Sequence, residues 1–253
     1  MVPMTSGAKK LICAAAMMAC AGPVSAETSH AHWSYDGDHG PSRWAELEAS
    51  YSSCAGSEQS PIDLNGQAIP AAVHAPAVYW KEADVTSVTN NGHTFQVDLS
   101  DAGKIVIDDV PYHFLQFHFH SGSEHTFHGR RFPLEVHLVH QSADGRLAVI
   151  GVMFAQGEHN PLLDDLINVM PGAPGSLSPI MKVNLNDFLP GDWSAYRYEG
   201  SLTTPPCSEI VAWTVFEKPL SASADQFAVF ETLFPHSYRP VQPQNRRFVL
   251  KTD

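Results

Sequence analysis

The chain has 253 residues, of which 43% are hydrophobic and 17% are charged, so it has enough apolar side chains for a sizeable core and too many for a disordered protein. With 27 acidic and 15 basic residues its formal net charge is −12, which argues against nucleic acid or an anionic membrane surface as a partner. The 14 histidines are many for this length and direct attention to metal or proton chemistry.

The first 26 residues have the pattern of a secretory signal. A pair of lysines precedes an apolar run at residues 11–21, and a stretch of small residues ends at Ala26. We predict cleavage after Ala26, which leaves residues 27–253 as one exported domain with no stable membrane insertion. The run is shorter than the about 20 residues of a spanning helix, which argues against a retained anchor. The expected location is the periplasm, with secretion or a lipid anchor at Cys20 as the alternatives.

The rest of the chain has the pattern of a sheet protein. Turn residues recur at short intervals, with no internal repeat, long linker or break in composition. A hairpin is predicted over residues 94–107, with its turn at 100–103. The expected architecture is mostly β, a single domain on one large, mostly antiparallel sheet with small surface helices. Further strands are predicted at residues 112–120, 132–140, 147–154, 193–198 and 209–216.

Two helices are predicted from their start signals. Asn160 precedes a proline and an apolar run, as an N-cap before a helix does. Ser223 and Gln226 have the spacing of a capping box.

Only two cysteines, Cys54 and Cys207, follow the predicted signal. An even number in an oxidising compartment predicts one disulfide, and two free buried thiols are the alternative.

The first of two histidine-bearing strands contains the alternating stretch 116–120. Because side chains alternate between the faces of a strand, Gln116, His118 and His120 share one face, and the intervening phenylalanines point to the core.

A second strand carries Glu135 and His137 on one face. If the two strands are neighbours, three imidazoles lie on the same side of the sheet. Three neutral nitrogen ligands suit Zn²⁺ with its fourth position open, which is a catalytic arrangement. Gln116 and Glu135 are placed to accept hydrogen bonds from the ligand N–H groups. The alternative is a set of hydrogen-bonded histidines on a polar sheet face.

A series of motifs, in order along the chain, resembles the alpha-class carbonic anhydrases. The resemblance extends from about His32 to Arg247, and the stretch 201–207 is its most distinctive part. The matching stretches are HWSY at 32–35, GPSRW at 40–44, QSPI at 59–62, QFHFH at 116–120, GSEHT at 122–126, EVHLVH at 135–140 and SLTTPPC at 201–207.

The resemblance implies a twisted central sheet with zinc at the base of a cleft, held by His118, His120 and His137. The implied activity is the reversible hydration of carbon dioxide to bicarbonate and a proton, by attack of zinc-bound hydroxide. The implied small-molecule partners are carbon dioxide and bicarbonate, in a monomer or a homodimer. A non-catalytic binding module on the same fold and a zinc hydrolase of esters are the alternatives.

The resemblance also assigns roles around the metal. Thr203 orients the hydroxide and donates its own proton to Glu124, and His93 shuttles protons to solvent. The matched cysteines form the disulfide of exported members. Ser121 and Gln96 depart from the tryptophan and asparagine often found at these positions, and neither change removes a ligand. The implied substrate-binding residues are Val139, Val149, Leu202, Thr203, Thr204, Val211 and Trp213, and the residues that order water in the cleft are Tyr35, Asn91, Gln96 and Thr204.

Overall fold

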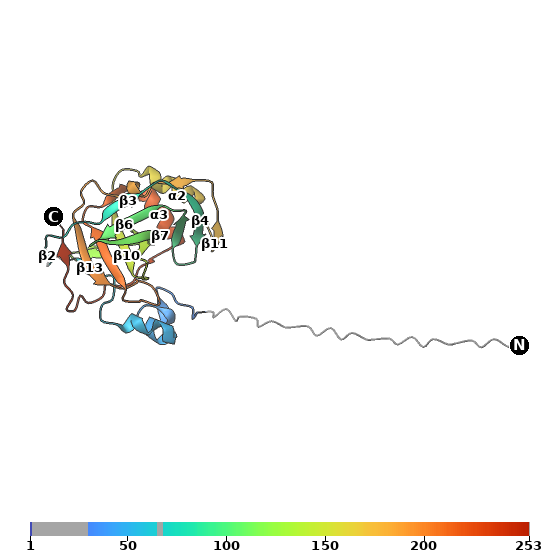
Figure 1. The fold of residues 1–253 in the computed structure, drawn as a ribbon, viewed down its shortest axis with the longest axis horizontal. Coiled ribbons are helices and arrows are strands. Elements are labelled where there is room, and N and C mark those ends of the chain that lie inside the picture. The colour runs from blue at the N-terminus through green and yellow to red at the C-terminus, as the bar shows by residue number, and fades with distance from the viewer. Residues whose placement is uncertain (2–29, 65–67, 253) are drawn as a thin grey trace. The chain divides into compact units, whose positions relative to one another are not determined.

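The computed structural model describes residues 1, 30–64 and 68–252 (Figure 1). Residues 2–26 of the predicted signal, which include Cys20 and the cleavage site, lie outside the described residues. Residues 31–253 form one compact unit. No helix in the described part of the chain is long and apolar enough to span a membrane.

One 14-stranded sheet organises the fold (Figure 1). Most neighbouring strands are antiparallel, as predicted, and a few pairs are parallel. A separate parallel pair joins β1 (Asp63–Leu64) to β8 (Thr126–Phe127). The strands of the large sheet are β2 (Ile69–Pro70), β3 (Ala77–Trp80), β4 (Ala83–Asn90), β5 (Phe95–Leu99), β6 (Gly103–Ile107), β7 (Val110–Ser121), β9 (Leu134–Gln141), β10 (Leu147–Gln156), β11 (Gly175–Leu177), β12 (Lys182–Val183), β13 (Ala195–Gly200), β14 (Val211–Phe216), β15 (Leu220–Ala222) and β16 (Leu250–Lys251).

The path through the sheet places the two histidine strands side by side at its centre. Its order is β11-β4-β5-β7-β9-β10-β14-β13-β16-β2. The predicted strands therefore exist, with ends that differ from the predicted ones by a few residues.

The hairpin predicted over residues 94–107 is wrong. β5 and β6 do not pair with each other, and both run antiparallel to β7. The tight turn is instead at Asp108 and Asp109, which have φ of 48° and 65° and join β6 to β7. Left-handed conformations at both central residues suit a two-residue hairpin. Gly103 does not make that turn. It allows β3 to come close to β6, because a Cβ at this position would collide with the carbonyl of Tyr79.

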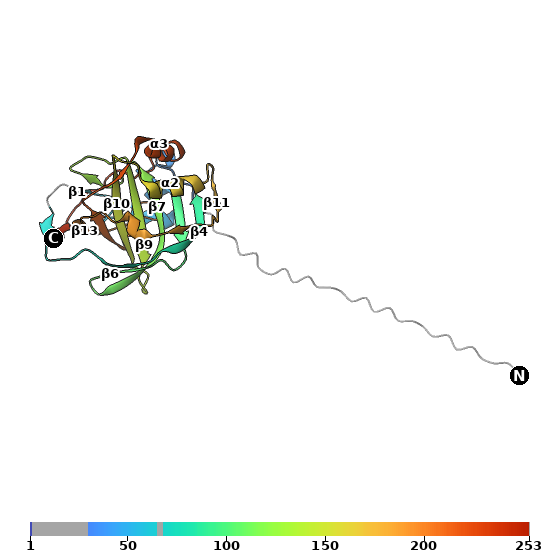
Figure 2. The same ribbon diagram turned by 90° about the horizontal axis from the view of Figure 1, so that it is seen from above.

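The helices are few and short, as predicted. Asn160 accepts hydrogen bonds from the backbone at the start of α2 (Pro161–Val169), and Ser223 and Gln226 form a complete capping box on α3 (Ala224–Leu233). The two helices contact each other, and α3 also packs on β7 (Figure 2). The remaining helical segments are α1 (Trp44–Leu47) and the 3₁₀ helices η1 (Gly37–His39), η2 (Ala49–Ala55) and η3 (Leu185–Phe188).

The two faces of the central strands have different surroundings. Phe117 and Phe119 are buried in the main apolar core. On the other face, Val149 and Trp213 belong to a second apolar cluster that borders the histidines. The alternation predicted for β7 is therefore the division between the core and the site.

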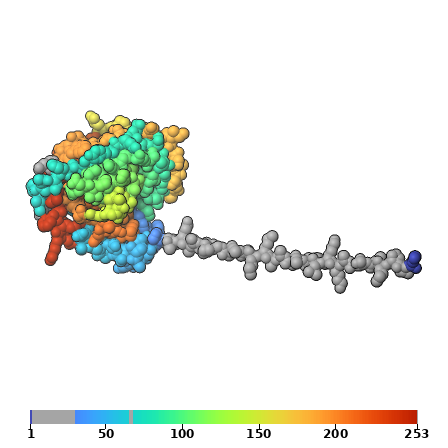
Figure 3. Space-filling view, viewed as in Figure 1, coloured from blue at the N-terminus to red at the C-terminus, as the bar shows by residue number. Residues whose placement is uncertain are grey.

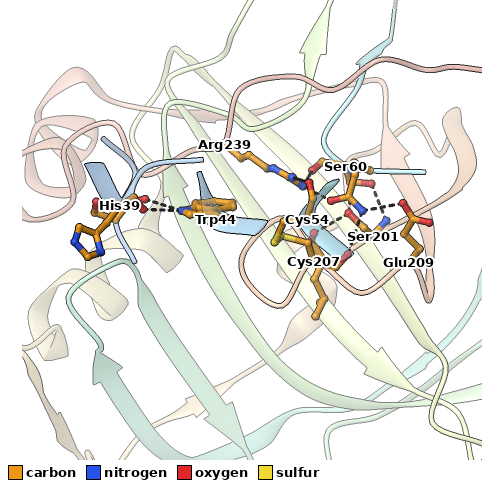
Figure 4. Close-up of a disulfide and its surroundings, with 11 residues drawn as sticks. His39, Trp44, Cys54, Ser60, Ser201, Cys207, Glu209 and Arg239 are labelled. Carbon is orange, nitrogen blue, oxygen red and sulfur yellow. Dashed lines mark hydrogen bonds between the residues drawn. A yellow bond between two sulfur atoms is a disulfide. The ribbon is translucent and has the colours of Figure 1, made fainter. Parts of the chain in front are cut away.

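The predicted disulfide joins Cys54 of η2 to Cys207 across 153 residues of sequence. In the space-filling view, blue residues that follow position 30 lie beside orange residues from beyond position 200 (Figure 3). The bridge fixes the loop that carries Thr203 to the N-terminal part of the compact unit (Figure 4). Closing so long a loop restricts the unfolded chain, by about 5 kcal/mol in the chain-entropy treatment.

Candidate metal centre

Three histidines from two neighbouring strands converge at one point. In the register of β7 and β9, His118 lies opposite His137, and His120 lies opposite Glu135. One ring nitrogen from each of the three histidines lies within 4.8 Å of the others. His120 and His137 are buried, and His118 is half-buried. The juxtaposition follows from strand pairing, because the three side chains share one face.

Each of the three rings uses its other nitrogen in a hydrogen bond to the protein. A ring N–H that donates to an oxygen leaves the second nitrogen with a lone pair, which is the form that binds a metal. The nitrogens that remain are Nε2 of His118, Nε2 of His120 and Nδ1 of His137. The observed bonds are His118 Nδ1 to Gln116 Oε1 (2.9 Å), His120 Nδ1 to the carbonyl of Ser237 (2.7 Å) and His137 Nε2 to Glu135 Oε1 (2.8 Å).

The local electrostatics favour neutral imidazoles at His118 and His120 beside a charged Glu135 carboxylate. Burial lowers the pKa of His118 far below its ordinary value, and the neighbouring His120 and His137 add to this shift. Burial also lowers the pKa of His120, against the opposing charge of Glu124. Burial by itself would raise the pKa of Glu135, but His125 and His137 hold it well below its usual range. Neutral rings are the state that a metal requires.

Two buried polar atoms at this point have no hydrogen-bond partner among the described residues: His120 Nε2 and Glu124 Oε2, which lie 3.4 Å apart. Leaving such atoms unpaired costs about 1–3 kcal/mol each. A divalent cation among the three imidazoles would satisfy the histidine nitrogen. Nitrogen ligands without thiolates fit zinc in a catalytic type of site.

A second buried cluster supports the first. Glu135 also accepts hydrogen bonds from the backbone N–H of His125 (2.9 Å) and from its ring Nδ1 (2.8 Å). His125 Nε2 is bonded to the Tyr198 hydroxyl (2.6 Å), which donates to Ser60 Oγ (2.9 Å). His125, Glu135 and His137 also have the geometry of a metal-binding group, but these bonds already engage their atoms. The cluster therefore acts as a scaffold that orients His137.

A cavity of about 120 Å³ opens onto two of the three histidines. His93 lies at its wall, half-buried, with its ring stacked on Trp33 at a centroid distance of 3.8 Å. Burial and the neighbouring His32 lower the pKa of His93. Asn91 fixes the turn by accepting hydrogen bonds from the backbone of His93 and Thr94. The cavity is lined by Trp33, Tyr35, Asn91, His93, Thr94, Gln96, Gln116, His118, His120 and Thr204.

Comparison with known proteins agrees with this geometry. A family model described as eukaryotic-type carbonic anhydrase matches residues 39–253. The chain belongs to the alpha-class carbonic anhydrase family. Its fold matches a solved alpha-carbonic anhydrase of Thermovibrio ammonificans in complex with the inhibitor sulfanilamide, with a TM-score of 0.85, 41% identity, and coverage of 88% of this chain and 100% of that one.

Curated relatives in the family are of similar length. A carbonic anhydrase of Klebsiella pneumoniae is 40% identical over 252 residues, which cover 98% of this chain and 99% of the relative. A carbonic anhydrase of Pectobacterium carotovorum is 38% identical over 226 residues, or 88% and 92% of the two chains. The chain is thus a member of an enzyme family, the zinc-dependent carbonic anhydrases.

The residues expected to hold carbon dioxide also come together. The apolar members of that set belong to the cluster that borders the histidines, where the ring of Trp213 lies 4.8 Å from that of His137. Thr203 and Thr204 are not part of this cluster. A larger cavity of about 980 Å³, lined by Arg197 and Phe248 among others, contains none of the three histidines. The cluster members are Val139, Val149, Val211 and Trp213, with Leu202 packed against them.

The position of Glu124 adds a contact that the sequence did not predict. Its Oε1 accepts a hydrogen bond from the backbone N–H of Arg239 at 2.7 Å. Its Oε2 accepts no hydrogen bond from the described residues, so a bond from Thr203 is an inference and not an observed contact. Thr203 itself is buried. Ser237 and Arg239 were missed because they lie in an irregular segment without a periodic pattern.

Proposed function

We propose that this protein catalyses the zinc-dependent, reversible hydration of carbon dioxide to bicarbonate and a proton. The observation that carries the proposal is the set of three imidazoles, each with one nitrogen bonded to the protein and the other facing the cluster. His118, His120 and His137 would hold the ion. When bound, zinc supplies a Lewis acid that lowers the pKa of a coordinated water to about 7, an effect for which carbonic anhydrases are the reference case.

The chain's own residues would set the direction of attack. We infer that Thr203 donates its hydroxyl proton to Glu124 Oε2, the buried oxygen that accepts no other hydrogen bond among the described residues. Its hydroxyl oxygen is then an acceptor, which orients the attacking group toward the substrate carbon. The backbone N–H of Arg239 holds the other carboxylate oxygen in place.

The apolar cluster would bind the substrate. Carbon dioxide has no net charge, and a wall that includes Val139, Val149 and Trp213 accepts it without displacing a hydrogen bond. Bicarbonate is charged, so the same wall favours its release.

A proton must leave after each turnover, and His93 is the residue proposed to carry it. It lies in the cavity that also reaches His118 and His120, together with the polar residues Tyr35 and Gln96. An imidazole suits this task because its ordinary pKa, about 6.5, is close to that of the donor.

The setting of the reaction is proposed to be the periplasm, after cleavage of residues 1–26. The disulfide supports export, because disulfides form and persist in oxidising compartments.

The test is a joint measurement of metal and activity. We expect about one zinc per chain, from three ligands with an open fourth position, and rapid carbon dioxide hydration in stopped-flow assays. His118→Ala is expected to lose both. A folded protein that binds zinc without hydrating carbon dioxide would contradict the activity, and a folded protein that binds no zinc would contradict the metal centre.

A further inference from the structure

Residues 237–239 contact the metal centre in two places. The carbonyl of Ser237 accepts the hydrogen bond from His120 Nδ1 at 2.7 Å, and its hydroxyl accepts one from the backbone N–H of Ser121 at 2.9 Å. Two residues later, the backbone N–H of Arg239 donates to Glu124 Oε1 at 2.7 Å. One short segment therefore orients both a candidate ligand and the carboxylate proposed to act with Thr203.

The segment belongs to no helix or strand, and the side chain of Arg239 ties it to the N-terminal part of the compact unit. Arg239 is buried, with 1% of its surface exposed. Its Nη1 donates to Gln59 Oε1 (2.8 Å) and to the carbonyl of Ser60 (2.9 Å), and its Nη2 donates to the carbonyl of Cys54 (3.1 Å). The guanidinium also lies 5.3 Å from the ring of Trp44 (Figure 4).

The residues that hold Arg239 also hold the loop of Thr203. Gln59 Nε2 donates to the carbonyl of Cys207 at 3.2 Å, and the backbone N–H of Ser60 donates to Ser201 Oγ at 2.9 Å. Figure 4 shows Ser60, Ser201 and Arg239 beside the disulfide. Residues 59 and 60 therefore lie between the two elements that must stay in register, the loop 201–207 and the segment 237–239.

Burying an arginine costs desolvation free energy, so stability alone does not explain this residue. Burial lowers the pKa of Arg239 to about 10, and the charge of Glu124 opposes this shift. Well-packed apolar residues often stabilise such a position better. What only arginine provides is a rigid fork of donors that reaches several oxygens at once.

We propose that Arg239 is a positioning residue, whose guanidinium anchors residues 237–239 to the segment 54–60 and so fixes His120 and Glu124 relative to Thr203. The expected effect of Arg239 on kcat rests on the proposed function. The expected effect of Arg239 on zinc binding acts through the orientation of His120 and does not require the proposed activity.

The chain offers a matched control in Arg247. It is also buried, and it also donates to backbone carbonyls, including that of Gln59 at 2.9 Å. None of its hydrogen bonds or ion pairs in the described part of the chain reaches His120 or Glu124. A purely structural role for buried arginine predicts the same result at both positions.

The experiment compares Arg239→Lys and Arg247→Lys in the zinc-loaded, full-length protein. Lysine keeps the charge and loses the fork. We expect Arg239→Lys to release zinc to a chelator about tenfold faster or more, the effect typical of losing support for a metal ligand. Its kcat should fall with little change in KM, and the visible spectrum of its cobalt(II) form should change. Arg247→Lys should lose thermal stability only.

The proposal is overturned if zinc release, cobalt spectrum and kcat are unchanged in Arg239→Lys, or if both variants change them equally. Should Arg239→Lys fail to fold, Gln59→Ala removes one partner of the guanidinium, together with the bond from Gln59 to the carbonyl of Cys207, without burying an unpaired charge. It should give the same changes in smaller measure, and an unchanged zinc release would then reject the proposal. Zinc release and the cobalt spectrum need no carbon dioxide hydration, so they judge Arg239 even if the proposed activity is absent.

Discussion

His137 and His140 lie three residues apart in β9, on opposite faces, and both are buried. His137 uses one ring nitrogen to bond Glu135 and presents the other to the histidine cluster. His140 has both nitrogens engaged, Nδ1 with the carbonyl of Leu138 at 3.0 Å and Nε2 with the indole N–H of Trp80 at 3.1 Å. Burial alone therefore does not identify a metal ligand. What identifies one is a ring nitrogen without a hydrogen bond that lies close to the free ring nitrogens of other histidines.

The surroundings of the two rings explain the difference. His140 stacks on Trp80 and touches the edge of Phe114, in an apolar part of the fold with no carboxylate partner among the described residues. Burial lowers the pKa of His140 to about 3, so it is a neutral scaffold group at all ordinary pH values. His137 has two carboxylates nearby, those of Glu135 and Glu124.

The largest expected effect separates these two histidines directly. His137→Ala should weaken zinc binding by about two to three orders of magnitude, since zinc sites are worth about 10–16 kcal/mol over the whole ligand set. His140→Ala should keep its zinc and lose about 2–4 kcal/mol in free energy of unfolding, because it creates a cavity and leaves an indole N–H unpaired. Competitive chelator titration and urea unfolding measure the two. Loss of zinc in His140→Ala would contradict the assignment of His137 as a metal ligand and His140 as a scaffold group.

A smaller effect appears in the pH dependence of stability. The pKa of His140 is about 3 in the folded protein and about 6.5 when unfolded, so the unfolded chain binds the proton more readily below pH 6.5. The contribution of His140 to stability is complete above pH 6.5 and is lost as the pH falls toward 3. Between pH 7 and pH 5 this loss is about 2 kcal/mol.

The measurement is urea unfolding of wild type and His140→Gln at pH 7 and at pH 5. Titration of the other groups cancels in the difference between the two proteins. We expect the variant to lose less stability on acidification. Equal losses in both proteins would mean that His140 titrates normally in the folded state.

The smallest effect concerns His93, which belongs to neither class. It is half-buried and stacked on Trp33, at the wall of the cavity. In dilute buffer His93→Ala should lower turnover by about tenfold, below the roughly 10²- to 10⁴-fold typical of a positioned acid–base group, because buffer also carries protons. Added imidazole should restore the rate. Normal turnover in dilute buffer would exclude His93 as the main proton carrier.

The candidate metal ligands were accessible from the sequence because strands have a period of two. His118 and His120 had to share a face with Gln116, whatever their neighbours. Pairing with His137 needed only the assumption that the two strands are adjacent, which the register of β7 and β9 confirms. Both longer helices were also predicted correctly, since their capping residues act locally.

The hairpin prediction was wrong because two different structural roles of glycine cannot be told apart from the sequence. Asp-Ala-Gly at 101–103 is a strong turn signal, yet Gly103 serves the close approach of β3, and two aspartates make the turn. A glycine that a turn requires and one that a neighbouring strand requires look the same in a sequence.

By itself the sequence determined the mostly-β class, most of the strands, the cysteine pair, the helix starts and the imidazole set, because each depends on local periodicity, capping or composition. Only the tertiary structure decided which nitrogen of each histidine remains free and what holds Glu124. The carbonyl of Ser237 and the backbone N–H of Arg239 act on residues more than a hundred positions earlier in the chain. Such contacts use backbone N–H and C=O groups, which nearly all residues have, so no pattern of side chains in the sequence predicts them.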